Sequence, residues 1–231
     1  MFESYLSINK GITYRKFVFP TFKENGISLI NLYHPLIKNP IKNDFTAKSN
    51  VIVINGPNMS GKSTFLKSVS LCVYLANLGL GIPASKGIVP VFTDFSIGIN
   101  KKDDILKGYS HFMNEIVNLK NTLLKAASEK KCFAVFDELF SGTNNQDALE
   151  ICKVTINGLS SYSNSLFFVS THIQELQNVI NNDVSTYYLD CDLAESTPAF
   201  TYNIKKGWSN IKIGRILFEK EGLNKLLKSN F

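Results

Sequence analysis

VIVINGPNMSGKST, at residues 51–64, places a run of β-branched residues directly before a glycine-bearing loop. The compact apolar run Val51–Ile54 is typical of a buried strand. From Lys62 to Leu78 the apolar residues recur at helical spacing, and Gly79 then ends the predicted helix. The stretch therefore predicts a strand, a loop and a helix in direct succession.

The loop matches the pattern G-x-x-x-x-G-K-[ST] in full, as GPNMSGKS at residues 56–63. Its two glycines let the backbone turn and direct N–H groups at phosphate oxygens. In this pattern the lysine reaches the β- and γ-phosphates, and the following hydroxyl binds Mg²⁺. A glycine-rich turn without a ligand is the alternative, but the strand–loop–helix context favours a nucleotide site. We expect that site to comprise Gly56, Pro57, Asn58, Met59, Ser60, Gly61, Lys62, Ser63 and Thr64, with Ser63 also on the metal.

Short apolar runs alternate with helical segments along the rest of the chain. This alternation predicts an α/β fold with a mostly parallel sheet flanked by helices. Further strands are expected at 88–92, 95–99, Cys132–Phe136, Leu166–Val169, Thr186–Leu189 and Ala199–Ile204, the last two as a possible hairpin. Helices are expected at 110–128, 146–160 and about 173–181, and residues 215–229 form a last amphipathic segment.

The N-terminal part of the chain has a weaker pattern. Residues 12–32 alternate loosely, with turn signals at Pro20 and Asn25-Gly26, and predict short antiparallel strands leading into the main sheet. Residues 39–50 are polar and predict a loop. We therefore divide one domain into a lead-in at residues 1–48 and a P-loop core at residues 49–231.

Two carboxylates follow the predicted strand in FAVFDE, residues 133–138. Ligands of open α/β sheets bind at the carboxyl edge of the strands, where these side chains would lie. Asp137 is placed to hold Mg²⁺, directly or through water, and Glu138 is the candidate general base that orients the attacking water. An acid pair at a helix N-terminus is the alternative interpretation. LFFVSTH, residues 166–172, ends a third strand at His172, which predicts contact with a γ-phosphate or the attacking water, although a lone histidine is more often packed or solvent-facing.

Composition bounds the class of protein. Hydrophobic residues make up 44% of the 231 residues and charged residues 19%, which excludes a disordered chain. The net charge of +6 fits a nucleotide or nucleic-acid partner. The four cysteines form no C-x-x-C pair and predict buried thiols in a reducing, cytoplasmic compartment. No apolar run reaches the roughly 18 residues of a membrane span, so we expect no membrane partner.

Several motifs in this order resemble the MutS family of DNA mismatch repair proteins, and specifically its C-terminal ABC-type ATPase domain. The resemblance covers about residues 14–215 and includes PTF (20–22), His34-Pro35, GPNMSGKST (56–64), GYSHFMNEI (108–116), DELFSGTNNQDA (137–148) and STH (170–172). GYSHFMNEI departs from the family pattern, because His111 replaces a threonine. The resemblance implies an ATPase that binds ATP or ADP with Mg²⁺.

The resemblance also implies partners and residue roles. MutS ATPase domains pair head-to-tail, so Ser110 would contact the γ-phosphate of the partner subunit's nucleotide, and Asn58 would line its own nucleotide. Lys62 would act as the transition-state cation, with Arg215 as a further candidate. Turnover in the homodimer would drive clamp movement on double-stranded DNA, which we expect to be contacted mainly through regions missing from this chain. The adenine-stacking residue is open between Phe45, Ile37 and Ile41.

Two other functions compete with this expectation. One is a nucleotide-dependent dimerisation switch with little turnover, which Glu138 disfavours because such a switch needs no general base. The other is a different ABC-type DNA-maintenance ATPase or a transporter ATPase. Against it, the usual Leu-Ser-Gly-Gly signature is missing and Gly108-Tyr-Ser-His stands instead.

Overall fold

The buried strand predicted at Val51–Ile54 is β4 (Val51–Asn55), in the interior of a six-stranded sheet. The computed structural model describes residues 2–99, 111–128, 130–194 and 197–228, and the sheet order is β10-β9-β4-β8-β7-β6. The other strands are β6 (Asp94–Gly98), β7 (Cys132–Phe136), β8 (Leu166–Ser170), β9 (Ser185–Ala194) and β10 (Thr197–Lys206). All neighbours are parallel except β9 and β10, which form the antiparallel hairpin. The predicted mostly parallel α/β fold is confirmed.

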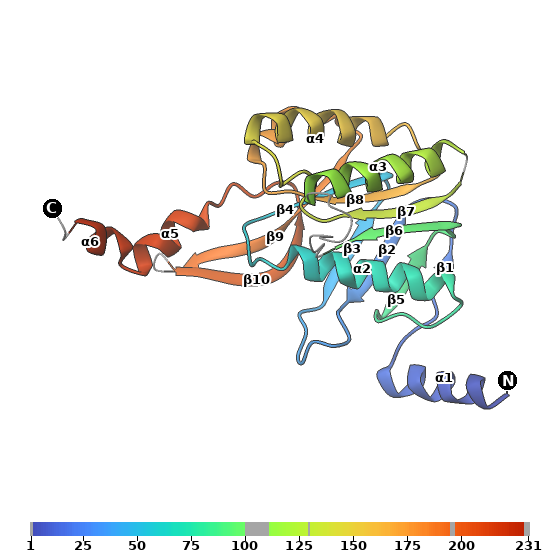
Figure 1. Ribbon diagram of the computed structural model, residues 1–231. Helices are drawn as coiled ribbons and strands as arrows, with labels where there is room; N and C mark the ends of the chain where they lie inside the picture. Colours follow the sequence, from blue (N-terminus) through green and yellow to red (C-terminus); the bar gives the residue numbers. More distant parts are fainter. Residues whose placement is uncertain (1, 100–110, 129, 195–196, 229–231) are drawn as a thin grey trace.

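Helices cover both faces of this sheet, with α3 (His111–Ala127) and α4 (Asn145–Leu159) on one face and α2 (Lys62–Asn77) on the other (Figure 1). The period-2 alternation of β4 divides its buried side chains between the two layers. Ile52 and Ile54 belong to the core with α2, whereas Val51 and Val53 belong to the core with α3 and α4. Because β4 is buried on both faces, its sequence is a continuous apolar run.

A second sheet packs against α2 and has the order β1-β5-β2-β3. Its strands are β1 (Thr21–Phe22), β2 (Ile27–Leu32), β3 (Asn43–Ala47) and β5 (Lys86–Val89). The strand β3 corrects the loop predicted at 39–50. Only Phe45 and Ala47 of β3 point into the core, and two apolar residues among polar neighbours give too short an alternation to recognise.

The short strands predicted within residues 12–32 do not start at residue 12, because residues 12–15 are the end of helix α1 (Phe2–Arg15). Figure 1 shows α1 standing apart from both sheets. A helix satisfies its own backbone hydrogen bonds, so this segment needs no partner strand. The predicted strands begin only after Pro20, with β1 and β2.

The helix predicted at 173–181 is only the short 3₁₀ helix η2 (Gln174–Asn178). Asn157 of α4 explains its early end, because the amide side chain donates to the carbonyl of Val179 and accepts from the N–H of Asn181. The chain closes with α5 (Ile213–Lys220) and α6 (Leu223–Lys228), beside the β9–β10 hairpin (Figure 1). Within the described part of the chain, no helix combines the length and apolar character needed to span a membrane.

Candidate functional site

The glycine-bearing loop joins the end of β4 to the start of α2, as the sequence predicts. Gly56 and Gly61 adopt φ values of +138° and +100°, in a region that L side chains rarely occupy. A Cβ on Gly56 would lie 3.1 Å from the carbonyl oxygen of Leu189. Gly61 is also the N-cap of α2, so the loop ends where the helix presents its free N–H groups. Both glycines are therefore required by the backbone path.

Lys62 is the first residue of α2, and its side chain reaches back to the start of the loop. Its Nζ donates to the carbonyl oxygens of Gly56 at 2.9 Å and Pro57 at 3.2 Å. Burial lowers the pKa of Lys62, and the negative charges of Glu138 and Asp137 oppose that shift. The ammonium group therefore lies in a partly desolvated site whose counter-charges are the two carboxylates at the end of β7.

The two acidic residues are held from the neighbouring strand β8, Asp137 by its side chain and Glu138 by its backbone. The Ser170 hydroxyl donates to Asp137 Oδ1 at 2.6 Å and accepts from the backbone N–H of Glu138 at 2.8 Å. Ser170 is fully buried, and Glu138 has a left-handed backbone with a φ of 53°. The sequence placed Ser170 at a strand end but gave no signal for this bridging role.

The structure brings the loop and Glu138 to one cleft of about 290 Å³, whereas Asp137 is not among the residues that line it. Lys62, Ser63 and Glu138 line the cleft together. Asn58, Met59, Gly61 and Thr64 complete the part of its lining that the sequence predicted, whereas Ser60 of the loop is fully buried and does not line the cleft. This arrangement puts a cation, a hydroxyl and a carboxylate around one open space.

Tyr202 of β10 is a lining residue that the sequence analysis missed. It lies against the loop, because a Cβ on Gly61 would meet Tyr202 Cδ1 at 3.1 Å. Tyr202 sits at a bulge of β10 with a φ of 57°, and Asn43 holds that bulge. Asn43 Nδ2 donates to the Tyr202 carbonyl at 3.0 Å, and its Oδ1 accepts from the N–H of Ile204 at 2.7 Å. A local bulge held from a distant strand leaves no periodic trace in the sequence.

A larger pocket of about 610 Å³ adjoins the cleft and shares Gly61, Thr64 and Tyr202 with it. Ile37 and Ile41 line this pocket. Phe45 does not, because its ring is buried in the core, 5.4 Å from Phe65 and 5.0 Å from Tyr187 between ring centroids. Of the three candidates for the adenine-stacking residue, Phe45 is therefore excluded by its burial, whereas Ile37 and Ile41 line the pocket together with Tyr202.

The sequence also predicted roles for His172, Arg215 and Ser110. His172 is exposed and lines a groove of about 450 Å³ on the other side of the loop, with Pro57 and Gln174, and it is not among the residues lining the cleft with Glu138. Arg215 is exposed on α5 and pairs with Glu219 at 2.7 Å. Ser110 lies outside the described residues. Like His172, Arg215 is not among the residues that line the cleft with Glu138.

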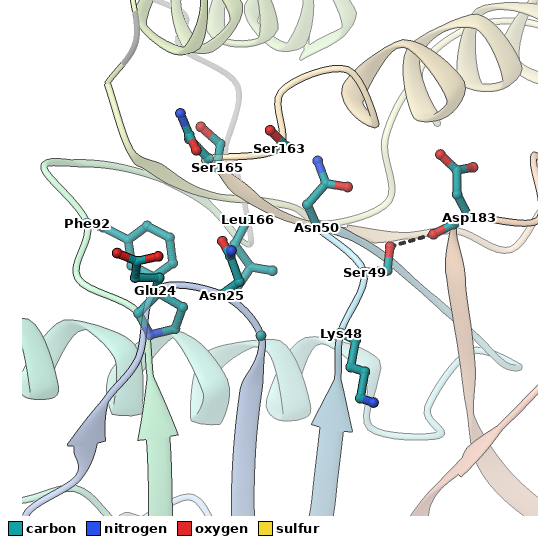
Figure 2. A pocket seen from close by; sticks show the side chains of 13 residues that line it. Glu24, Asn25, Lys48, Ser49, Asn50, Phe92, Ser163, Ser165, Leu166 and Asp183 are labelled. Atoms are coloured by element: carbon teal, nitrogen blue, oxygen red, sulfur yellow. Dashed lines mark hydrogen bonds between the residues drawn. The ribbon is translucent and has the colours of Figure 1, made fainter.

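A separate hollow of about 370 Å³ opens where the strands of the six-stranded sheet begin, at the end of the sheet opposite the glycine-bearing loop (Figure 2). Ser49 and Asn50 precede β4 there, and Asp183 precedes β9. Ser49 Oγ donates to the Asp183 carbonyl at 2.6 Å, and Asn50 Nδ2 donates to the Tyr162 carbonyl at 3.1 Å. These polar groups bond to neighbouring loops, and the hollow shares no lining residue with the phosphate-loop cleft.

These features define an α/β protein whose strand–loop–helix unit and acidic strand end are those of P-loop ATPase-like domains. A model of the family described as MutS domain V matches residues 52–224, and the chain belongs to this family. It is therefore related to the MutS DNA mismatch repair proteins through that one domain.

Three relatives agree with this assignment, and each is named DNA mismatch repair protein MutS. The chain is 29% identical to the protein of Bacillus pumilus over 211 residues, or 87% of this chain and 24% of the relative. It is 35% identical to that of Thermotoga neapolitana over 169 residues, or 71% and 21%. It is 30% identical to that of Natronomonas pharaonis over 212 residues, or 88% and 24%. The chain thus spans less than a quarter of the length of these relatives.

Proposed function

We propose that this chain is the ATP-binding and ATP-hydrolysing domain of a MutS-like DNA mismatch repair protein. The observation that carries the proposal is the cleft in which Lys62, Ser63 and Glu138 meet. A cation for phosphate oxygens, a hydroxyl for a metal and a carboxylate for water are the groups that phosphoryl transfer to water requires. Membership of the MutS domain V family supports the same function.

Phosphate binding falls to the loop and to Lys62. The positive-φ glycines and the start of α2 direct backbone N–H groups towards the cleft, where they favour an anion. Lys62 Nζ, now bonded to two carbonyls of the loop, would exchange those contacts for β- and γ-phosphate oxygens. The added negative charge would also offset the lowering of the Lys62 pKa by burial.

Magnesium is the metal that the donor set suits. The described residues contain no cluster of three or more metal-ligating His, Cys, Asp or Glu side chains. Ser63 and Asp137 offer a hydroxyl and a carboxylate, which fits a Mg²⁺ ion shared with phosphate oxygens and water better than an all-protein site. A bound Mg²⁺ would neutralise charge on the β- and γ-phosphates.

Glu138 is the proposed general base. Glu138 lines the cleft together with Lys62, and the hydrogen bond from its N–H to Ser170 fixes its backbone. From there it would orient a water molecule towards the γ-phosphate and accept its proton. His172 lines a different groove, so it would have to turn into the cleft to contact the γ-phosphate or the attacking water. That role for His172 stays a prediction from the sequence.

The adjoining pocket is proposed to hold the base and ribose of ATP or ADP. Tyr202 lies at the junction of the two spaces, where a ring can stack on a nucleobase while the phosphates extend along the loop. Ile37 and Ile41 supply apolar lining to the same pocket. The pocket is therefore of mixed polar and apolar character, as nucleotide sites commonly are.

At the level of the assembly, we propose an ABC-type homodimer with head-to-tail sites, in which Ser110 completes the partner subunit's nucleotide site. Coupling of turnover to clamp movement on double-stranded DNA would require further regions. The relatives, of which the chain spans less than a quarter, are named for DNA mismatch repair, and this supports DNA as the partner of the complete protein. The +6 charge agrees with weak, salt-sensitive phosphate contacts.

A nucleotide-dependent dimerisation switch with little turnover is the second candidate. The placement of His172 outside the cleft favours it, because one expected catalytic group is not in position. Both functions require nucleotide binding at Lys62, whereas only hydrolysis requires Glu138. These two residues therefore separate the candidates.

Steady-state ATP hydrolysis, measured against protein concentration, tests the proposal. We expect specific activity to rise with concentration, Glu138→Gln to keep ATP binding without turnover, and Lys62→Ala to lose both. Glu150→Gln, which neutralises an exposed acid on α4, is the matched control and should behave as the wild type. Binding without turnover in the wild type would favour the switch, and unchanged turnover in Glu138→Gln would remove Glu138 from the mechanism.

A further inference from the structure

The turn after β7 has an unusual backbone at two positions. Glu138 and Phe140 adopt φ values of 53° and 61°, although neither is a glycine. Left-handed residues of this kind persist only where their surroundings fix them. The side chains that hold this turn therefore decide where the Glu138 carboxylate points.

Two neighbouring elements hold the first part of the turn. From β8, the Ser170 hydroxyl accepts the Glu138 N–H at 2.8 Å. From α4, the Cys152 thiol donates to the carbonyl oxygen of Leu139 at 3.4 Å. Both Ser170 and Cys152 are fully buried, so these contacts are shielded from water.

Helix α3 holds the next residue. Glu115 Oε2 accepts the backbone N–H of Phe140 at 2.9 Å. The Phe140 ring also packs edge-on against Phe112 of α3, with 5.9 Å between ring centroids. Gly142 lies so close that a Cβ there would meet Phe112 Cβ at 3.3 Å. The beginning of α3 therefore packs closely against the turn at Phe140 and Gly142.

Glu115 differs from the other two anchors because it is acidic and has no exposed surface. A buried carboxylate is costly unless hydrogen bonds compensate for its lost hydration. A backbone N–H bonded to a carboxylate forms a stronger bond than one bonded to a neutral acceptor. The hydrogen bond of Glu115 lies two residues after Glu138, in the turn that has the positive φ values.

We propose that Glu115 is a positioning residue for Glu138: by binding the Phe140 N–H it fixes the turn that aims the Glu138 carboxylate into the cleft. The inference rests on the proposed function of Glu138 as general base. Glu115 acts through the backbone and does not itself line the cleft. Its removal is therefore expected to change turnover far more than nucleotide binding.

The test compares Glu115→Ala, Glu115→Gln and the exposed control Glu150→Gln in the full chain. Binding of a methylanthraniloyl-labelled ATP, kcat and KM for ATP, and hydrogen exchange of the amides of residues 138–142 are measured for each. We expect Glu115→Ala to exchange at least tenfold faster in the turn and to lose at least 30-fold in kcat, with the labelled-ATP affinity within threefold. Glu115→Gln keeps a carbonyl acceptor and should recover most of the protection and the kcat.

Wild-type exchange in the turn of Glu115→Ala would overturn the proposal. Faster exchange throughout β4, β7 and β8 would mean that the alanine variant has lost its fold, and Glu115→Gln then carries the test. A folded Glu115→Gln with a protected turn and a 30-fold loss of kcat would overturn the proposal, whereas near-wild-type values of both would support it. If the wild type binds the labelled ATP without turnover, the proposed function fails, while exchange in the turn still supports or overturns the role of Glu115.

Discussion

The hydroxyl of Ser170, at the end of β8, donates a 2.6 Å hydrogen bond to Oδ1 of Asp137, which directly follows the neighbouring strand β7. The same oxygen accepts the N–H of Glu138 at 2.8 Å. One buried hydroxyl therefore fixes the side chain of the proposed metal ligand and the backbone of the proposed general base. Parallel pairing of β7 with β8 brings the three residues together.

Ser170→Ala should impair both stability and turnover. It leaves the Glu138 N–H without its buried acceptor, so we expect the free energy of unfolding to fall by about 1–3 kcal/mol. Misplacement of the two carboxylates should lower kcat by about 10- to 100-fold. Urea unfolding and steady-state hydrolysis measure the two effects. The exposed Ser163→Ala is the control, and a Ser170→Ala variant with wild-type kcat would contradict the positioning role.

Tyr202→Ala should weaken nucleotide binding through the base alone. Stacking of a base on an aromatic ring contributes about 1–3 kcal/mol. We therefore expect the Kd for ATP to rise by roughly 5- to 150-fold, while Tyr202→Phe keeps its affinity. Competition by tripolyphosphate, which has no base, should be unchanged. Tyr14→Ala, on the exposed face of α1, is the control, and equal losses for ATP and tripolyphosphate would show that Tyr202 acts on the loop instead.

Gly61→Ala and Gly158→Ala should have opposite effects on stability. At Gly61 the φ of +100° is strained for alanine, and a Cβ 3.1 Å from Tyr202 Cδ1 would force the tyrosine ring to shift. We expect a loss of about 1–3 kcal/mol in the free energy of unfolding. Gly158 lies within α4 with no atom within 4 Å of a Cβ, so alanine should stabilise the fold by up to about 1 kcal/mol. Urea unfolding measures both changes in the free energy of unfolding. An unchanged free energy for Gly61→Ala would contradict the strain expected at Gly61.

The sequence predicted those parts of the fold whose signals are local. The double-sided burial of β4 and β7 gives continuous apolar runs, and α2 shows a clear helical period, so their positions were predicted to within a residue or two. Strand β3 was missed because its inward-facing residues are only Phe45 and Ala47. Helix α1 was not predicted, because the loose alternation from residue 12 onwards indicated short strands.

In the candidate site, too, the residues with local signals were predicted and those that depend on distant contacts were not. The loop and the acids at the end of β7 follow fixed spacings and were predicted by residue number. Tyr202 and Glu115 depend on contacts between segments far apart in the chain, through a bulge held by Asn43 and a turn seated on α3. Such contacts exist only after the sheets have assembled, so the sequence alone did not predict them.

The burial of the Cys152 thiol should make the stability of the fold fall at alkaline pH. Burial, and secondarily the charge of Glu115, raises the pKa of the Cys152 thiol to about 12 from an ordinary value of 9.0. The native state therefore keeps this proton to a higher pH than the unfolded chain does. Its contribution to stability is complete below pH 9 and is lost progressively as the pH rises towards 12, by up to about 1.4 kcal/mol per pH unit.

The Cys152→Ala variant isolates this contribution, because every other group titrates equally in both proteins. Urea unfolding of the wild type and the variant at pH 8 and pH 10 gives the difference between their free energies of unfolding. We expect the advantage of the wild type to shrink by about 1 kcal/mol between the two values. The lost packing and the hydrogen bond to Leu139 cost the variant equally at both, so they cancel. A difference that is independent of pH would mean that the thiol ionises in the native state as readily as in the unfolded chain.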